Sequence, residues 1–168
     1  MSKQKHMIAI VLENEAGALS RVVGLFSQRG YNIDSLTVST TQDPTLSRIT
    51  LVTQATDAQA EQITKQLHKL IPVLKVHDLT ESSFIERELL LVKCRADTEA
   101  QRSELTRLAD IFCGRIVDVT PASYVMQLAA KSSTIDALIQ ALGKIPILEM
   151  TRSGIVGMTR GARAISLK

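Results

Sequence analysis

The chain has 168 residues, of which 45% are hydrophobic and 22% charged, a balance that argues against disorder and against a fibrous repeat. With 20 Lys and Arg against 17 Asp and Glu, the net charge of +3 is too small to indicate a nucleic-acid or membrane-binding protein, and aromatic residues make up only 3%. The sequence contains no run resembling a signal peptide or membrane span, and its two cysteines form no metal-binding pair. We therefore expect a cytoplasmic protein with free thiols and no nucleic-acid or membrane partner.

The apolar pattern of the first half changes its period in a regular order. Residues 7–12 form a continuous apolar run, as expected of a strand buried on both faces. Between residues 19 and 26 the apolar side chains recur at helical spacing. Two alternating strands, a second helix and a fourth strand follow at residues 36–38, 49–53, 63–70 and 74–76. This order is βαββαβ.

The second half repeats this order with little residue identity. Strands are expected near residues 89–94, 116–119, 124–128 and 147–150, and helices near 105–112 and 135–142. We expect Gly114 to close the first of these helices and the polar residues 80–83 to link the halves. The glycine-rich segment 153–161 matches no phosphate-binding loop, so it is interpreted as a flexible or partner-binding tail.

Two βαββαβ units predict an α+β protein with two tandem ferredoxin-like domains, at residues 6–80 and 85–168. Each sheet then has the strand order 4-1-3-2, with both helices on one face and the other face open. The second strand lies at an edge, whose unpaired backbone groups favour association. We therefore expect a homodimer that pairs these edges.

No residue pattern indicates catalysis. The histidines His6, His68 and His77 stand beside no nucleophile and at no metal-ligand spacing, so we interpret them as surface or helix-face residues. The carboxylates Glu86 and Glu88 are interpreted as part of a solvated charge cluster at the start of a strand. We expect neither a catalytic site nor a metal site.

The loop between the first strand and the first helix is the strongest candidate for a binding site. The N–H groups at the helix start have no intrahelical partners, and Gly17 lets a ligand approach the backbone closely. The helix dipole favours a carboxylate there, and the Asn14 amide can hydrogen-bond an amino acid. In an edge-paired dimer, Asn32 and Ile33 of one chain would approach this loop of the other. The alternative is a capped tight turn with no ligand.

At this loop the sequence resembles a known family. Residues 12–36 resemble the ACT domain of the acetolactate synthase (acetohydroxyacid synthase) small subunit. Similar pieces recur in order at residues 43–48, 65–70, 112–121 and 152–157. The resemblance implies an N-terminal ACT domain, for effector binding and dimerisation, followed by a C-terminal ferredoxin-like domain.

This resemblance also implies a function in branched-chain amino acid biosynthesis. The chain would be a non-catalytic regulatory subunit that activates a large catalytic subunit and confers feedback inhibition by valine. The partner would convert two pyruvate molecules to 2-acetolactate and CO2 with thiamine diphosphate, Mg2+ and, as a further candidate, FAD, while this chain would bind no cofactor. Valine would sit between two ACT domains, held by Asn14, Gly17, Ala18, Leu19, Asn32 and Ile33.

Several alternatives stay open at this point. A free-standing ACT-domain amino-acid sensor would bind an effector without an enzyme partner. The residues do not separate valine from leucine or isoleucine, since one methylene in a pocket is worth only about 1–3 kcal/mol. Nor do they identify the surface that contacts the catalytic subunit, the role of the second domain, or an assembly larger than a dimer.

Overall fold

A computed structural model describes residues 2–165. The chain divides into two compact units, one formed by the residues up to Ile85 together with those from Ile155 onward, the other by Glu86–Gly154. Each unit contains a four-stranded antiparallel sheet and two helices, so the predicted α+β class with two ferredoxin-like units is confirmed. The described residues after Gly154 belong to the first unit by their contacts, which differs from the predicted division at 85–168.

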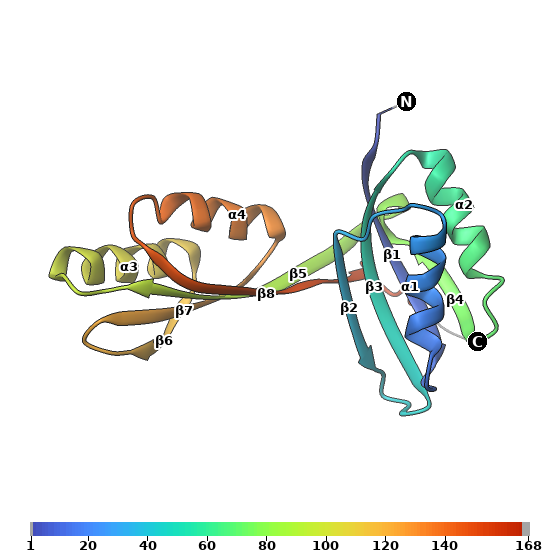
Figure 1. The fold of residues 1–168 in the computed structure, drawn as a ribbon, viewed down its shortest axis with the longest axis horizontal. Coiled ribbons are helices and arrows are strands. Elements are labelled where there is room, and N and C mark those ends of the chain that lie inside the picture. The colour runs from blue at the N-terminus through green and yellow to red at the C-terminus, as the bar shows by residue number, and fades with distance from the viewer. Residues whose placement is uncertain (1, 166–168) are drawn as a thin grey trace. The chain divides into compact units, whose positions relative to one another are not determined.

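The first unit has the predicted βαββαβ order. Its elements are β1 (Gln4–Glu13), α1 (Ala18–Gln28), β2 (Ser35–Thr40), β3 (Leu46–Ala55), α2 (Asp57–Leu67) and β4 (Val73–Asp78). The sheet order β2-β3-β1-β4 is the expected one, with β2 at an edge. Both helices lie on the same face of this sheet (Figure 1), where their apolar sides and the inward side chains of β1 and β3 form one core.

The other face of this sheet is covered, contrary to the expectation of an open face. Met7, Ala9 and Val52 pack there against Leu79 and Ile155. Leu79 directly follows β4, whereas Ile155 comes from the end of the last strand of the chain. Gly157 of that strand fits there because it lacks a side chain. A Cβ atom at this position would lie 2.5 Å from the Met7 sulfur and 3.0 Å from a Leu79 methyl group.

Side-chain hydrogen bonds hold the same segment against the sheet. The Arg48 guanidinium donates to the Gly157 carbonyl oxygen at 2.7 Å, and the Thr37 hydroxyl donates to the Ile155 carbonyl oxygen at 3.1 Å. These bonds fix the segment to β3 and to the edge strand β2. The predicted polar linker is also ordered, because residues 79–81 form a 3-10 helix (η1, Leu79–Glu81) whose Leu79 side chain is fully buried.

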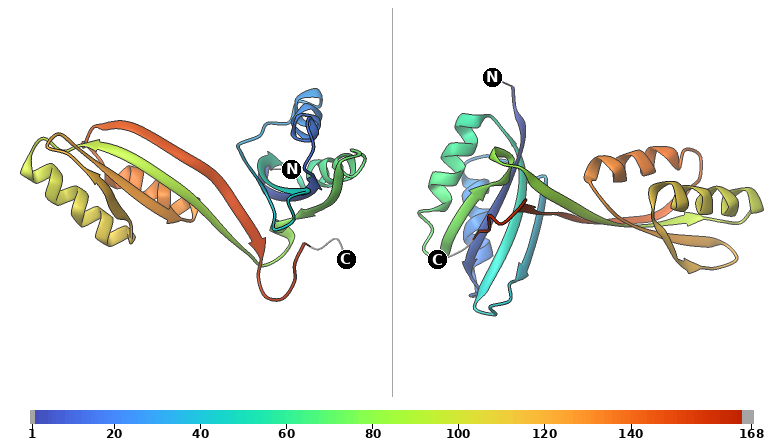
Figure 2. Two further views of the ribbon diagram at one scale, coloured as in Figure 1. Left: turned by 90° about the horizontal axis from the view of Figure 1, so that it is seen from below. Right: turned by 180° about the vertical axis from the view of Figure 1, so that it is seen from behind.

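The second unit repeats the topology. Its elements are β5 (Phe84–Arg95), α3 (Glu99–Phe112), β6 (Arg115–Val119), β7 (Ser123–Ala130), α4 (Ser132–Ala141) and β8 (Ile147–Thr159), with the sheet order β6-β7-β5-β8. Helices α3 and α4 lie on one face of this sheet, as the views in Figure 2 show. Strand β8 extends nine residues beyond the predicted end at residue 150, so the interpretation of the segment from residue 153 as a flexible tail is wrong for residues 153–159.

The end of α3 also differs from the prediction. The left-handed residue after this helix is Cys113, with φ 57° and ψ 33°, and not Gly114. Gly114 is required for another reason, since a Cβ atom there would lie 2.9 Å from the carbonyl oxygen of Gln127 on β7. The glycine therefore allows the chain to enter β6 close to its neighbouring strand.

A buried ion pair stabilises the second unit. Glu88, interpreted from the sequence as solvated, is only 5% exposed. It accepts two hydrogen bonds from Arg152, at 2.7 and 3.1 Å, and one from the Ser132 hydroxyl at 2.9 Å. Arg152 also donates to Asp136 at 2.7 Å. Burial raises the pKa of Glu88, but the bonds from Arg152 and Ser132 outweigh it, so that the pKa lies below its usual value.

Candidate functional site

The loop after β1 is fixed by the side chain of Asn14. Its amide nitrogen donates to the Pro44 carbonyl oxygen at 2.9 Å, and its amide oxygen accepts from the Ser47 hydroxyl at 3.2 Å. The Asn14 backbone N–H donates to the Thr45 carbonyl oxygen at 2.8 Å. Asn14 therefore joins the loop to the turn between β2 and β3, a positioning role that sequence reasoning did not assign to it.

That turn is itself held by Asp43. Its carboxylate accepts from both the hydroxyl and the backbone N–H of Thr45, at 2.6 and 2.9 Å. The hydrogen bond from the Thr45 hydroxyl lowers the pKa of Asp43 most, and the bond from the Thr45 backbone N–H lowers it further. The turn thus presents a carboxylate that is ionised at neutral pH, close to the loop.

Gly17 is the N-cap residue before helix α1 and lies in the left-handed region, with φ 86°, which favours glycine. No side chain caps this helix, and Ala18 is the first residue in it. The N–H groups of Leu19 and Ser20 donate to no described residue. A Cβ atom on Gly17 would meet no atom within 4 Å, so the space beside the Gly17 backbone is open. This end can therefore accept an anionic group.

The side chains of Ala18 and Leu19 pack mainly in the hydrophobic core of the first unit. Ala18 is buried, and Leu19 is partly buried against the same apolar cluster. The Ala18 N–H donates to the Glu15 carbonyl oxygen at 3.3 Å, so of these two residues only Leu19 has a backbone N–H that donates to no described residue.

Asn32 and Ile33 lie at the opposite end of β3. The Asn32 carbonyl oxygen accepts from the Thr53 hydroxyl at 2.6 Å, and its side chain donates to Asp34 at 2.7 Å. Ile33 packs partly against the core. Ser47, which contacts Asn14, lies six residues from Thr53 along this strand, or about 20 Å. One chain therefore does not bring the two groups of candidate residues together.

A second polar cluster surrounds His6, which is buried in β1 and not on the surface as expected. Its Nδ1 atom lies 2.7 Å from an Asp78 carboxylate oxygen and 3.4 Å from the Thr80 hydroxyl. The other ring nitrogen, Nε2, lies 3.6 Å from an Asp57 carboxylate oxygen at the start of α2. The cluster therefore joins β1 to the start of η1 and to the start of α2.

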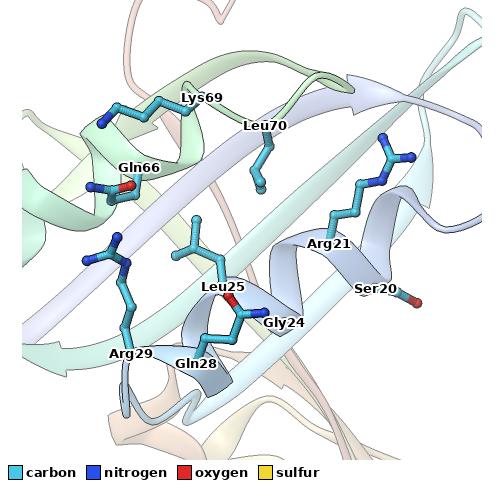
Figure 3. A pocket seen from close by; sticks show the side chains of 9 residues that line it. All are labelled: Ser20, Arg21, Gly24, Leu25, Gln28, Arg29, Gln66, Lys69 and Leu70. Atoms are coloured by element: carbon cyan, nitrogen blue, oxygen red, sulfur yellow. The ribbon is translucent and has the colours of Figure 1, made fainter.

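The two helices of the first unit are separated by an open groove of about 470 Å³ that sequence reasoning missed. Figure 3 shows the apolar side chains of Leu25 and Leu70 between the helices, and the Arg29 side chain extending towards α2. The lining combines residues 20–29 of the first helix and its end with Gln66, Lys69 and Leu70. Apolar periodicity predicts which helix faces are buried, but it does not show where two buried faces leave a gap.

Among residues 2–165, no three His, Cys, Asp or Glu side chains are grouped so as to hold a metal ion. Within the same range, no helix is long and apolar enough to cross a membrane.

Comparison with known proteins identifies the family. Residues 8–75 match the model of the acetohydroxyacid synthase small subunit-like ACT domain, and residues 87–161 match that of the small subunit of acetolactate synthase. The acetolactate synthase small subunit of Haemophilus influenzae is 55% identical, over 96% of this chain and 99% of that protein. The chain belongs to the acetolactate synthase small-subunit family.

Two further relatives support this assignment. The small subunit of Escherichia coli acetolactate synthase isozyme 3 is 51% identical, over 94% of this chain and 96% of that protein. The crystal structure of the acetolactate synthase small subunit from Thermotoga maritima superposes with a TM-score of 0.86 at 34% identity, covering 95% of this chain and 99% of that one. The resemblance expected from residues 12–36 is therefore confirmed, and it extends through both units.

Proposed function

We propose that this chain is the regulatory subunit of an acetolactate synthase in branched-chain amino acid biosynthesis. It activates a catalytic large subunit, which binds thiamine diphosphate and Mg2+ and forms 2-acetolactate and CO2 from two pyruvate molecules. The observation that supports this most strongly is the similarity to acetolactate synthase small subunits over nearly the full length of both chains.

The effector site is proposed to form between two copies of the chain. If two β2 edges pair antiparallel, the start of one β2 lies beside the end of the other. Asn32 and Ile33 precede the start of β2, and the turn that contacts Asn14 follows its end. Antiparallel pairing therefore brings Asn32 and Ile33 of one chain towards Asn14 and the helix start of its partner, closing the gap of about 20 Å within one chain.

The residues of this site suit a small aliphatic amino acid. The N–H groups of Leu19 and Ser20 would bind the carboxylate, assisted by the helix dipole. The ammonium group would contact amide oxygens of Asn14 and of the partner's Asn32. Ile33 offers an apolar wall for the side chain, which favours an aliphatic amino acid such as valine over a polar or charged one.

Feedback inhibition follows from linkage. Valine stabilises the paired arrangement that binds it, and the coupled enzyme shifts towards a less active state. Couplings of this kind typically amount to about 1–3 kcal/mol.

Dimers made from two different variants test whether the site is shared between copies. Both Asn14→Ala and Asn32→Ala homodimers should bind valine about tenfold more weakly or worse, since each loses a hydrogen bond to a charged group in both sites. A dimer of one Asn14→Ala and one Asn32→Ala chain carries both changes in one site and neither in the other. Random mixing should therefore restore full affinity at about one quarter of the sites, measured by calorimetry.

Restoration requires that Asn14 and Asn32 act from different chains. If the mixture binds no better than the separate homodimers, the proposed site between two copies is wrong. Analytical ultracentrifugation of each sample provides the control, since all of them should sediment as dimers.

A further inference from the structure

The open groove between α1 and α2 is basic. Three of its nine lining residues are cations, namely Arg21, Arg29 and Lys69, and none is a carboxylate. Arg21 lies 3.8 Å from Glu15, whereas Arg29 and Lys69 form no ion pair with any residue among 2–165. The groove therefore carries a positive charge that the described part of the chain does not neutralise.

A glycine in the wall of the groove has no structural reason within the chain. Gly24 lies inside α1, where glycine costs roughly 1 kcal/mol relative to alanine. Its φ is not positive, and a Cβ atom there would meet nothing within 4 Å. The missing side chain leaves the helix backbone accessible from the groove, which allows another chain to approach closely.

The groove also has an apolar character. Leu25 and Leu70 lie on its floor, with the amides of Gln28 and Gln66 beside them (Figure 3). Ile71, the next residue after Leu70, is 86% exposed. A small anion could neutralise the charges but would leave Ile71 in water, whereas a protein segment could cover it as well.

We infer that this groove, formed by Arg21, Gly24, Leu25, Arg29, Lys69 and Leu70, docks an acidic amphipathic segment of the catalytic large subunit. The inference rests on the proposed function and names the surface that would carry the activation. No residue of β2 lines the groove, so docking there leaves this edge free for pairing.

Two variants test the groove by different means. Arg29→Glu/Lys69→Glu reverses two charges, and Gly24→Gln fills the groove while replacing glycine by a better helix former. Each should raise the concentration needed for half-maximal stimulation of the purified large subunit by about tenfold or more. The wild-type requirement should itself rise with added salt, since the charges are exposed.

The control is Lys3→Glu/Lys144→Glu, which changes the net charge equally at two exposed positions outside the groove. It should stimulate as the wild type does. All variants should keep the dimer by sedimentation and valine binding by calorimetry. None should lower the thermal unfolding temperature, as loss of a purely structural role would, and Gly24→Gln should raise it slightly.

The results of these experiments separate the groove inference from the proposed function. If the wild type stimulates and the groove variants do so at the same concentration, the groove is not the docking surface. If the variants lose the dimer, the groove instead contacts a second copy of this chain, and the inference is wrong. If the wild-type chain fails to stimulate the large subunit, the proposed function is wrong, and so is the inference that a segment of the large subunit docks in the groove.

Discussion

Replacing Gly17 by Asp should weaken valine binding about 100-fold or more, because like charges held close together cost several kcal/mol. The new carboxylate would stand at the uncapped start of α1, where the carboxylate of valine is proposed to bind. It would also accept hydrogen bonds from the N–H groups of the first turn, which are proposed to bind the ligand carboxylate. Calorimetry on the isolated chain measures the loss directly.

The matched control is Gly17→Asn. Asn and Asp are both tolerated in the left-handed region that Gly17 occupies, and they have nearly the same shape. The variants therefore share any backbone strain and differ in charge. Gly17→Asn should bind valine more tightly than Gly17→Asp, and both should remain dimers. Equal binding by the two variants would contradict a carboxylate site at this helix start.

The second large effect is expected in the second unit, where Arg152→Met should cost about 3–5 kcal/mol of unfolding free energy at pH 7. The variant leaves the carboxylate of Glu88, 5% exposed, without its cationic partner. The double variant Glu88→Gln/Arg152→Met removes the buried charge and should recover most of this loss. Urea unfolding followed by circular dichroism gives the free energies.

The contribution of Glu88 to the free energy of unfolding should change with pH in opposite directions in the wild type and in Arg152→Met. In the wild type the folded-state pKa of Glu88 is lowered, so its stabilising contribution is present above the unfolded-state pKa and is lost as the pH falls through the folded-state pKa. In Arg152→Met only the hydrogen bond from Ser132 still opposes the burial of Glu88, and burial is the larger influence, so the pKa of Glu88 is raised. The deficit of this variant should therefore shrink on acidification from about pH 7 to pH 5. A deficit that stays constant over this range would argue against a buried, unpaired carboxylate.

The order of elements and the sheet topology could be predicted because apolar periodicity changes with each element. Residues 7–12 are buried on both faces of the sheet, and their unbroken apolar run indicates that directly. The end of β8 could not be predicted in the same way. Its Gly154 and Gly157 resemble loop residues, and Gly157 is explained only by Met7 and Leu79, which are distant in sequence.

The candidate site shows the same limit. Asn14 and Gly17 stand in one short loop, so their common location follows from the sequence. The hydrogen bonds from Asn14 to the β2–β3 turn depend on strand register, which the sequence pattern leaves open. The buried state of Glu88 was missed for a related reason, because its partner Arg152 lies 64 residues away.

The most direct test of the proposed function is to mix the purified chain with its cognate large subunit and measure acetolactate formation with and without valine. The large subunit alone should be slow and insensitive to valine, and the isolated chain should form no acetolactate. The mixture should be faster and should be inhibited by valine, whereas a mixture with Gly17→Asp should be equally fast but resistant. If the chain neither stimulates the large subunit nor changes its response to valine, the role of enzyme regulator is contradicted, and a free-standing amino-acid sensor becomes the better account.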